Sequence, residues 1–216
     1  MPSSATSKTP ALILTETLPD PYDSHATRRL GLMLEVLAER HALFLAVMAT
    51  GRMHLRAWRH ANRLSSSITI EPLRAIRRGD LPISRTVSRW VDRENPPLVV
   101  TTSSRLWPAL RWFRDRLVVA DLADELAGAL DPGTQEVRAN GGARRVYQQA
   151  CRTAERTHLA LVARQSHVGP LLTRAGRTVV LPDGLLTRLP EILDAIGRPE
   201  GGAEADSWST RVAQAA

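Results

Sequence analysis

Two patterns of apolar residues alternate along this chain. Short runs rich in Leu, Ile and Val are followed by longer segments in which apolar residues recur every three or four positions. Continuous apolar runs are typical of strands that are covered on both faces of a sheet. We predict such strands over residues 11–14, 43–48, 68–70, 98–100, 117–120, 159–162 and 178–181.

The segments between these runs have the spacing of amphipathic helices. After a turn-rich segment at residues 18–24, apolar side chains recur at Leu30, Met33, Leu34 and Leu37. The charged residues of this helix are expected largely on its opposite face: Arg28, Arg29, Glu35, Glu39 and Arg40. Further helices are predicted over residues 52–63, 83–94, 106–113, 143–156, 168–174 and 189–196.

Strands that alternate with helices indicate βαβ units and a mainly parallel sheet. We therefore predict an α/β fold, with a single Rossmann-like domain over residues 10–186. Residues 1–9 are expected to be a disordered N-terminus, and residues 187–216 a C-terminal helix and flexible tail. In such folds ligands bind at the carboxyl ends of the strands, so we expect the ligand-binding side chains in the loops that leave those ends.

Composition excludes several classes of protein. Hydrophobic residues make up 43% of the 216 residues and charged residues 24%, as in an ordinary globular domain. A single cysteine, Cys151, excludes a disulfide framework within the chain and a thiolate-rich zinc site. Neither a signal peptide nor a membrane-spanning apolar stretch is found, so we expect a cytoplasmic protein.

The net charge of +7 raises the question of nucleic-acid binding. Lys8 is the only lysine among the 29 basic residues, which is typical of GC-rich coding bias, and aromatic residues are only 4%. Since no basic stripe is interleaved with aromatic side chains, no nucleic-acid partner is predicted. The basic segment 52–63 is either a solvated arginine face, which we favour, or a peripheral contact with the inner face of a membrane.

The loop after the first strand is the first candidate site. It leads into a helix N-terminus, where Ser24 and Thr27 offer hydroxyls and Arg28 offers positive charge for a phosphate or a polar acceptor. The alternative is that Asp23 or Ser24 simply caps the helix. Neither a GxGxxG nor a GxxxxGK[ST] motif is found, which argues against a dinucleotide or P-loop site.

A second group of polar residues follows the strand at 98–100. Thr102, Ser103 and Arg105 lie in the segment after this strand and are suited to a hydroxyl-rich ligand such as a sugar. The alternative is a loop whose hydroxyls cap the helix that follows. The sequence leaves both alternatives open.

Carboxylates follow the strand at 117–120. Asp121 comes directly after it, where its side chain can act as a base or accept a hydrogen bond from a ligand hydroxyl, and Asp124 is suited either to ligand binding or to capping the next helix. Of the six histidines, only His25 lies in a crevice loop, and it is the second candidate base. No metal-ligand motif is formed by the histidines.

The order of these pieces resembles the N-terminal domain of GT-B glycosyltransferases of the family 4 type. Leu37-Ala-Glu-Arg-His41 matches the family's L-A-x-R-H before the second strand, and Asp121-Leu-Ala-Asp124 its D-x-x-D. The helix-to-strand segment from Arg145 to Val162 and the final Val179-Val-Leu-Pro-Asp-Gly184 match its later motifs. The match covers most of residues 10–186.

The chain also departs from that family. Ser24-His25 replaces its glycine pair, Thr101 or Thr102 replaces a histidine, and Pro182-Asp183-Gly184 replaces P-N-G. In the family this last motif leads into the donor domain, whereas only 32 residues follow Gly184 here. We therefore expect the donor domain to be lost or to lie on a separate chain.

The resemblance implies a transferase acting on a sugar. It predicts the acceptor-binding half of an enzyme that transfers a sugar from a nucleotide sugar to a glycan, lipid or small-molecule acceptor. No cofactor or divalent metal is implied, and the expected partners are the acceptor and a second glycosyltransferase chain. The alternatives are a non-catalytic accessory or relic protein, and an unrelated Rossmann-like module that binds a nucleotide or DNA.

Overall fold

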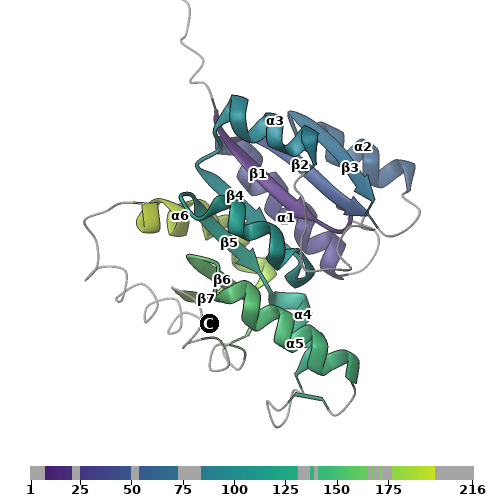
Figure 1. The fold of residues 1–216 in the computed structure, drawn as a ribbon, viewed down its shortest axis with the longest axis vertical. Helices are drawn as coiled ribbons and strands as arrows, with labels where there is room; N and C mark the ends of the chain where they lie inside the picture. Colours follow the sequence, from purple (N-terminus) through teal and green to yellow (C-terminus); the bar gives the residue numbers. More distant parts are fainter. Residues whose placement is uncertain are drawn as a thin grey trace, which may run out of the picture.

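A computed structural model of the chain describes residues 8–20, 25–49, 54–72, 84–130, 137–138, 141–164, 167, 171 and 177–197. The described strands form one sheet in the order β3-β2-β1-β4-β5-β6-β7, and every neighbouring pair is parallel (Figure 1). The predicted α/β, Rossmann-like fold with a parallel sheet is therefore confirmed.

Each predicted strand is present in the sheet. The strands are β1 (Thr9–Thr15), β2 (His41–Ala49), β3 (Ser67–Pro72), β4 (Leu98–Thr101), β5 (Leu117–Asp121), β6 (Leu159–Val162) and β7 (Thr178–Val180). β1 begins at Thr9, one residue before the predicted start of the domain.

Helices connect the strands and cover both faces of the sheet. They are α1 (His25–Arg40), α2 (Leu55–Leu64), α3 (Arg85–Glu94), η2 (Ser104–Phe113), α4 (Ala123–Ala129), α5 (Gly141–Ala154), η5 (Asp183–Arg188) and α6 (Leu189–Gly197). The predicted helix at 168–174, apart from residue 171, and the tail beyond residue 197 lie outside the described residues. None of the described helices combines the length and apolar character that crossing a membrane requires.

The alternation of side chains along β1 builds two cores. Ala11 and Ile13 face α1, α2 and α6 on one side, and Leu12 and Leu14 face α3 and η2 on the other. A third cluster packs α4 and α5 against β5 and β6. Because both faces are covered, the strands need apolar residues throughout, which explains the continuous runs in the sequence.

The segment predicted as a helix at 106–113 is a 3-10 helix that begins two residues earlier. Ser103 caps it by accepting a hydrogen bond from the Arg105 backbone N–H at 3.2 Å. Pro108 lies inside the helix and removes one backbone donor from it.

The strand order sets the position of a ligand site. From β1 the chain proceeds outward through β2 to β3, and from β4 it proceeds the opposite way through β5, β6 and β7. The connections after β1 and β4 therefore diverge, which leaves a crevice at the carboxyl ends of these two strands.

Candidate functional site

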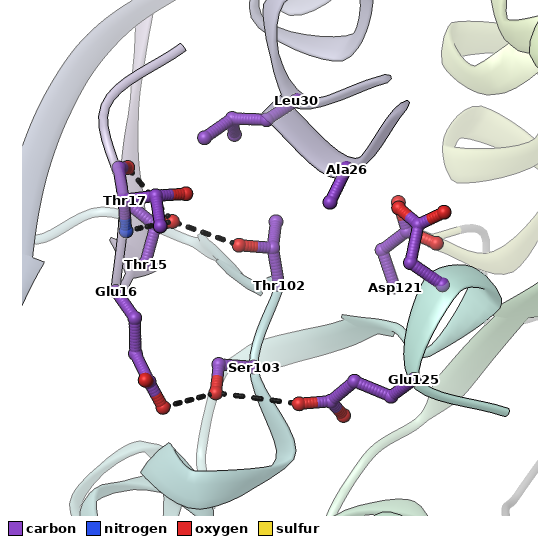
Figure 2. A pocket seen from close by; sticks show the side chains of 10 residues that line it. Thr15, Glu16, Thr17, Ala26, Leu30, Thr102, Ser103, Asp121 and Glu125 are labelled. Atoms are coloured by element: carbon purple, nitrogen blue, oxygen red, sulfur yellow. Dashed lines mark hydrogen bonds between the residues drawn. The ribbon is translucent and has the colours of Figure 1, made fainter. Parts of the chain in front are cut away.

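A cavity of about 180 Å³ lies at this crevice (Figure 2). Its walls come from the carboxyl ends of β1, β4 and β5 and from the first turns of α1 and α4. The described residues that line it are Thr15, Glu16, Thr17, Ala26, Leu30, Thr102, Ser103, Asp121, Asp124 and Glu125.

Threonine hydroxyls form the wall on the β1 side. The hydroxyl of Thr102, after β4, donates to the Thr15 Oγ1 at 3.0 Å. The Thr15 hydroxyl in turn donates to the carbonyl of Thr17 at 3.1 Å and accepts from the Thr17 N–H at 3.3 Å. This chain of bonds fixes the orientation of Thr15, while the Thr102 oxygen retains lone pairs for a ligand.

Glu125, in the first turn of α4, faces the cavity from the opposite side. Both of its carboxylate oxygens lie 2.9 Å from the backbone N–H of Ser104, at the start of η2. Burial raises the pKa of the Glu125 carboxyl to about 7, against these opposing bonds from Ser104, and the neighbouring Glu16 charge adds to the rise. A carboxyl group with this pKa can both take up and release a proton near neutral pH.

Glu16 comes directly after β1 and is oriented by the segment after β4. The Ser103 hydroxyl donates to its Oε1 at 2.5 Å and lies 3.4 Å from the Oε1 of Glu125 (Figure 2). Arg105 pairs with the other oxygen of Glu16 at 2.9 Å. Arg105 therefore holds a wall of the cavity through Glu16.

Asp121 is held by a buried arginine, Arg29 of α1. The Arg29 Nε and Nη2 donate to the two oxygens of Asp121 at 2.8 and 3.1 Å, and its Nη1 donates to Asp183 at 2.7 Å. Only 1% of the Arg29 side chain is exposed, so its predicted place on the polar face of the helix is wrong. Arg29 packs toward the sheet because two carboxylates meet all three of its terminal nitrogen groups there.

For each member of this ion pair, burial and the charge of the partner shift the pKa in opposite directions. Burial lowers the pKa of Arg29, but the charge of Asp121 and the hydrogen bonds to both carboxylates outweigh it, and the pKa of Arg29 is raised. Burial raises the pKa of Asp121, and the Arg29 charge offsets this only in part. Asp121 is less available as a base than Glu125, because a charged arginine engages both oxygens of Asp121 whereas neutral donors bind Glu125.

His25 is the first residue of α1 and bridges two further carboxylates. Its Nδ1 hydrogen-bonds to the Asp124 Oδ1 at 2.6 Å, and its Nε2 lies 3.1 Å from the Asp183 Oδ2. The structure thus brings the two predicted bases to the same rim of the sheet, because Asp183 contacts both His25 and the Arg29 that holds Asp121.

The other predicted site residues have different positions. Thr27 is buried, and its hydroxyl donates to the carbonyl of Asp20 at 3.2 Å. Arg28 is exposed and does not belong to the described lining of the cavity. Ser24 lies outside the described residues. Thr102, Ser103, Asp121 and Asp124 all line the cavity.

Sequence reasoning did not select Glu16, Glu125, Arg29 or Asp183. Glu16 directly follows a buried strand, the same signal that selected Asp121, so it was open to detection. Arg29 lies four positions before Met33, on the buried face of the helix, and a charge on such a face indicates a buried partner. Its partners are distant in sequence, and only the fold identifies them.

The cavity lining is acidic and therefore does not suit a phosphate ligand. Four of the described lining residues carry carboxylates and none is basic: Glu16, Asp121, Asp124 and Glu125. Within the described part of the chain, no group of three or more His, Cys, Asp or Glu side chains is arranged to hold a metal ion. The site is instead equipped to accept hydrogen bonds from a ligand that carries hydroxyl groups.

The chain was compared with known proteins. No protein-family model matches it, and no curated protein matches its sequence. Because Rossmann-like folds serve many unrelated activities, the function must be argued from the chemistry of the cavity.

Proposed function

We propose that this chain binds a hydroxyl-rich acceptor in the cavity and acts as the acceptor-side half of a GT-B-like glycosyltransferase. The observation that carries the proposal is the meeting of threonine hydroxyls and carboxylates around one cavity, with Glu125 at its wall. The cavity of about 180 Å³ is smaller than the roughly 300–1,000 Å³ of drug-sized sites, so it suits a single sugar-sized ring.

The proposed reaction places a base beside the acceptor. An acceptor hydroxyl attacks the anomeric carbon of a nucleotide sugar, its proton passes to the Glu125 carboxylate, and the bond from that carbon to the diphosphate breaks. The pKa of Glu125, near 7, suits this proton transfer. The nucleotide sugar is bound by a separate domain or chain, which also supplies stabilisation of the leaving diphosphate.

A non-catalytic accessory role is the second candidate. It is favoured by the state of Asp121, whose two oxygens are both engaged by Arg29, and by the contact of His25 with two carboxylates. In that case the cavity binds a glycan or a glycosyltransferase partner's ligand without transferring it.

Acceptor binding can be tested by NMR titration of the ¹⁵N-labelled chain with a panel of monosaccharides and methyl glycosides. We expect shifts at the backbone amides of Thr15, Thr17 and Ser103, because these residues line the cavity. Thr102→Val should weaken binding by about fivefold, since it removes one hydroxyl of the wall. Thr69→Val, on the edge strand β3, is the matched control and should bind as wild type.

The two candidates differ in the effect of Glu125→Gln on a neutral acceptor. If Glu125 is the base, this variant keeps the acceptor affinity but loses sugar transfer in the presence of a donor-domain chain and UDP- or GDP-sugars. An accessory role predicts no transfer by either protein. No shift at the cavity with any sugar in the panel would overturn the proposed function.

A further inference from the structure

We infer that the ligand of this cavity carries a positively charged amine beside its hydroxyls, as an amino sugar or an aminocyclitol does. The inference rests on the proposed function, because it names the class of acceptor that the same cavity selects. It is carried by the distribution of charge around the cavity.

The arginines next to the cavity are not part of its described lining. Arg29 is almost fully buried, and its nitrogens bind Asp121 and Asp183. Arg105 is engaged with Glu16. None of the described lining residues is an arginine or a lysine, so the lining itself supplies carboxylates and no basic side chain to a ligand.

One of the four lining carboxylates differs from the others. Asp121 is paired with Arg29 and Glu16 with Arg105, and Asp124 is hydrogen-bonded to the His25 ring. Within the described part of the chain, Glu125 is bound by the Ser104 N–H and the Ser103 hydroxyl but by no cationic side chain.

An ammonium group of the ligand next to Glu125 would give this carboxylate a cationic partner. It can donate charge-assisted hydrogen bonds to the carboxylate, and it supplies the counter-charge that the protein does not. The hydroxyls of Thr17 and Thr102 remain to bind the hydroxyls of the same small ring. A phosphate or carboxylate on the ligand would instead meet the Glu125 carboxylate, which has no cationic partner among the described residues, so repulsion disfavours anionic sugars.

The binding of an amine also depends on the protonation state of the Glu125 carboxyl. The charged and titratable groups around Glu125 are Glu16 with Arg105 after β1 and β4, Asp121 with Arg29, and Asp124 with His25. Arg152 of α5, which packs against both α4 and η2, and Arg156, two residues beyond α5, lie over the ring of Trp107. Because burial raises the pKa of Glu125 to about 7, an ammonium ligand must displace the Glu125 proton below that pH.

The test compares three probes of one ring size: glucosamine, glucose and glucose 6-phosphate. Their affinities are measured by NMR titration of the whole chain. We expect glucosamine to bind about tenfold more tightly than glucose, and glucose 6-phosphate most weakly. Glucosamine should bind about fivefold more weakly at about pH 6 than at about pH 7, while glucose affinity stays constant.

Variants assign the effect to one carboxylate. Glu125→Gln should reduce the preference for glucosamine to about twofold or less and abolish its dependence on pH, since the amide neither titrates nor carries charge. Glu191→Gln, an exposed glutamate on α6, is the matched control and should keep both.

The outcomes separate this inference from the proposed function. Equal or tighter binding of glucose overturns the inference and leaves a sugar-binding cavity. Binding of cyclohexylamine as tightly as glucosamine overturns the proposed recognition of hydroxyls and leaves only a cation site. The absence of binding by all probes overturns both.

Discussion

Arg29 is the residue on which the rim of the sheet depends most. It joins α1 to the end of β5 through Asp121 and to η5 through Asp183. A buried ion pair recovers its desolvation cost only while each partner is present, and removal of one partner leaves an uncompensated buried charge. The geometry of the cavity wall therefore depends on a contact that does not itself touch the ligand.

We expect Arg29→Met to destabilise the protein by about 3–5 kcal/mol, because Asp121 is left buried without its counter-charge. The free energy of unfolding is measured by urea denaturation. Arg40→Met is a control of the same type, since Arg40 pairs with Asp194 of α6 at 2.8 Å while both side chains are more than half exposed.

The control should cost no more than about 1 kcal/mol, as exposed ion pairs do. Equal losses for Arg29→Met and Arg40→Met would show that the buried pair has no special role. A smaller loss for the double variant Arg29→Met/Asp121→Leu than for Arg29→Met alone would identify the unpaired carboxylate as the cause.

At the scale of single residues, the sequence predicted part of the site. Asp121, Asp124, Thr102 and Ser103 were found because a polar residue after a buried strand must lie at the carboxyl edge. The partners of these residues were not predictable in the same way. Arg29 and Asp183 are 154 positions apart, and only the packing of η5 against α1 joins them.

At the scale of secondary-structure elements, the first turn of η2 fixes the position of the Glu125 carboxylate. Its Ser104 N–H binds the Glu125 carboxylate, and its Ser104 carbonyl accepts a hydrogen bond from the Thr153 hydroxyl of α5 at 3.1 Å. Thr153 is fully buried. The first turn of η2 is thus held between α4 and α5.

We predict that Thr153→Val lowers the free energy of unfolding by about 1–3 kcal/mol, because the buried Ser104 carbonyl loses this bond while the volume of the side chain is kept. Thermal or urea unfolding measures the loss. Thr69→Val, the same change on the half-buried edge strand β3, should alter stability by less than about 0.5 kcal/mol. An equally small effect of Thr153→Val would show that α5 does not hold η2.

The positions of the strands and helices were predicted more completely than the helix type and the residue at which η2 begins. The strands were recognisable because a doubly covered sheet requires continuous apolar runs. The 3-10 form of η2 was not predicted, since the apolar spacing of Leu106, Leu110 and Phe113 also fits an α-helix. The extra residues at its start are fixed by capping from Ser103, which periodicity does not report.

The whole molecule is organised around β1 and β4. These two strands are paired on both edges and covered on both faces, whereas β3 and β7 lie at the edges of the sheet. Their carboxyl ends contribute the threonine wall of the cavity, so the most enclosed strands help to position the site.

Hydrogen exchange should follow this order. We expect the amides of Leu12, Ile13 and Val100 to exchange at least about tenfold more slowly than those of Ile70 and Val179, because central strands open only in the largest unfolding events. Hydrogen–deuterium exchange read by NMR gives the rates. Comparable rates at the centre and the edges would contradict a single cooperative sheet.

The order of the strands in the sheet has a consequence for folding during synthesis on the ribosome. β1 leaves the ribosome first, but β4, which pairs with its second edge, is made only after β2 and β3. Until then the nascent chain exposes an open strand edge, and neither Thr102 nor Glu125 exists to close the cavity. A ligand of this cavity can therefore stabilise only chains in which the residues up to Glu125 have left the ribosome.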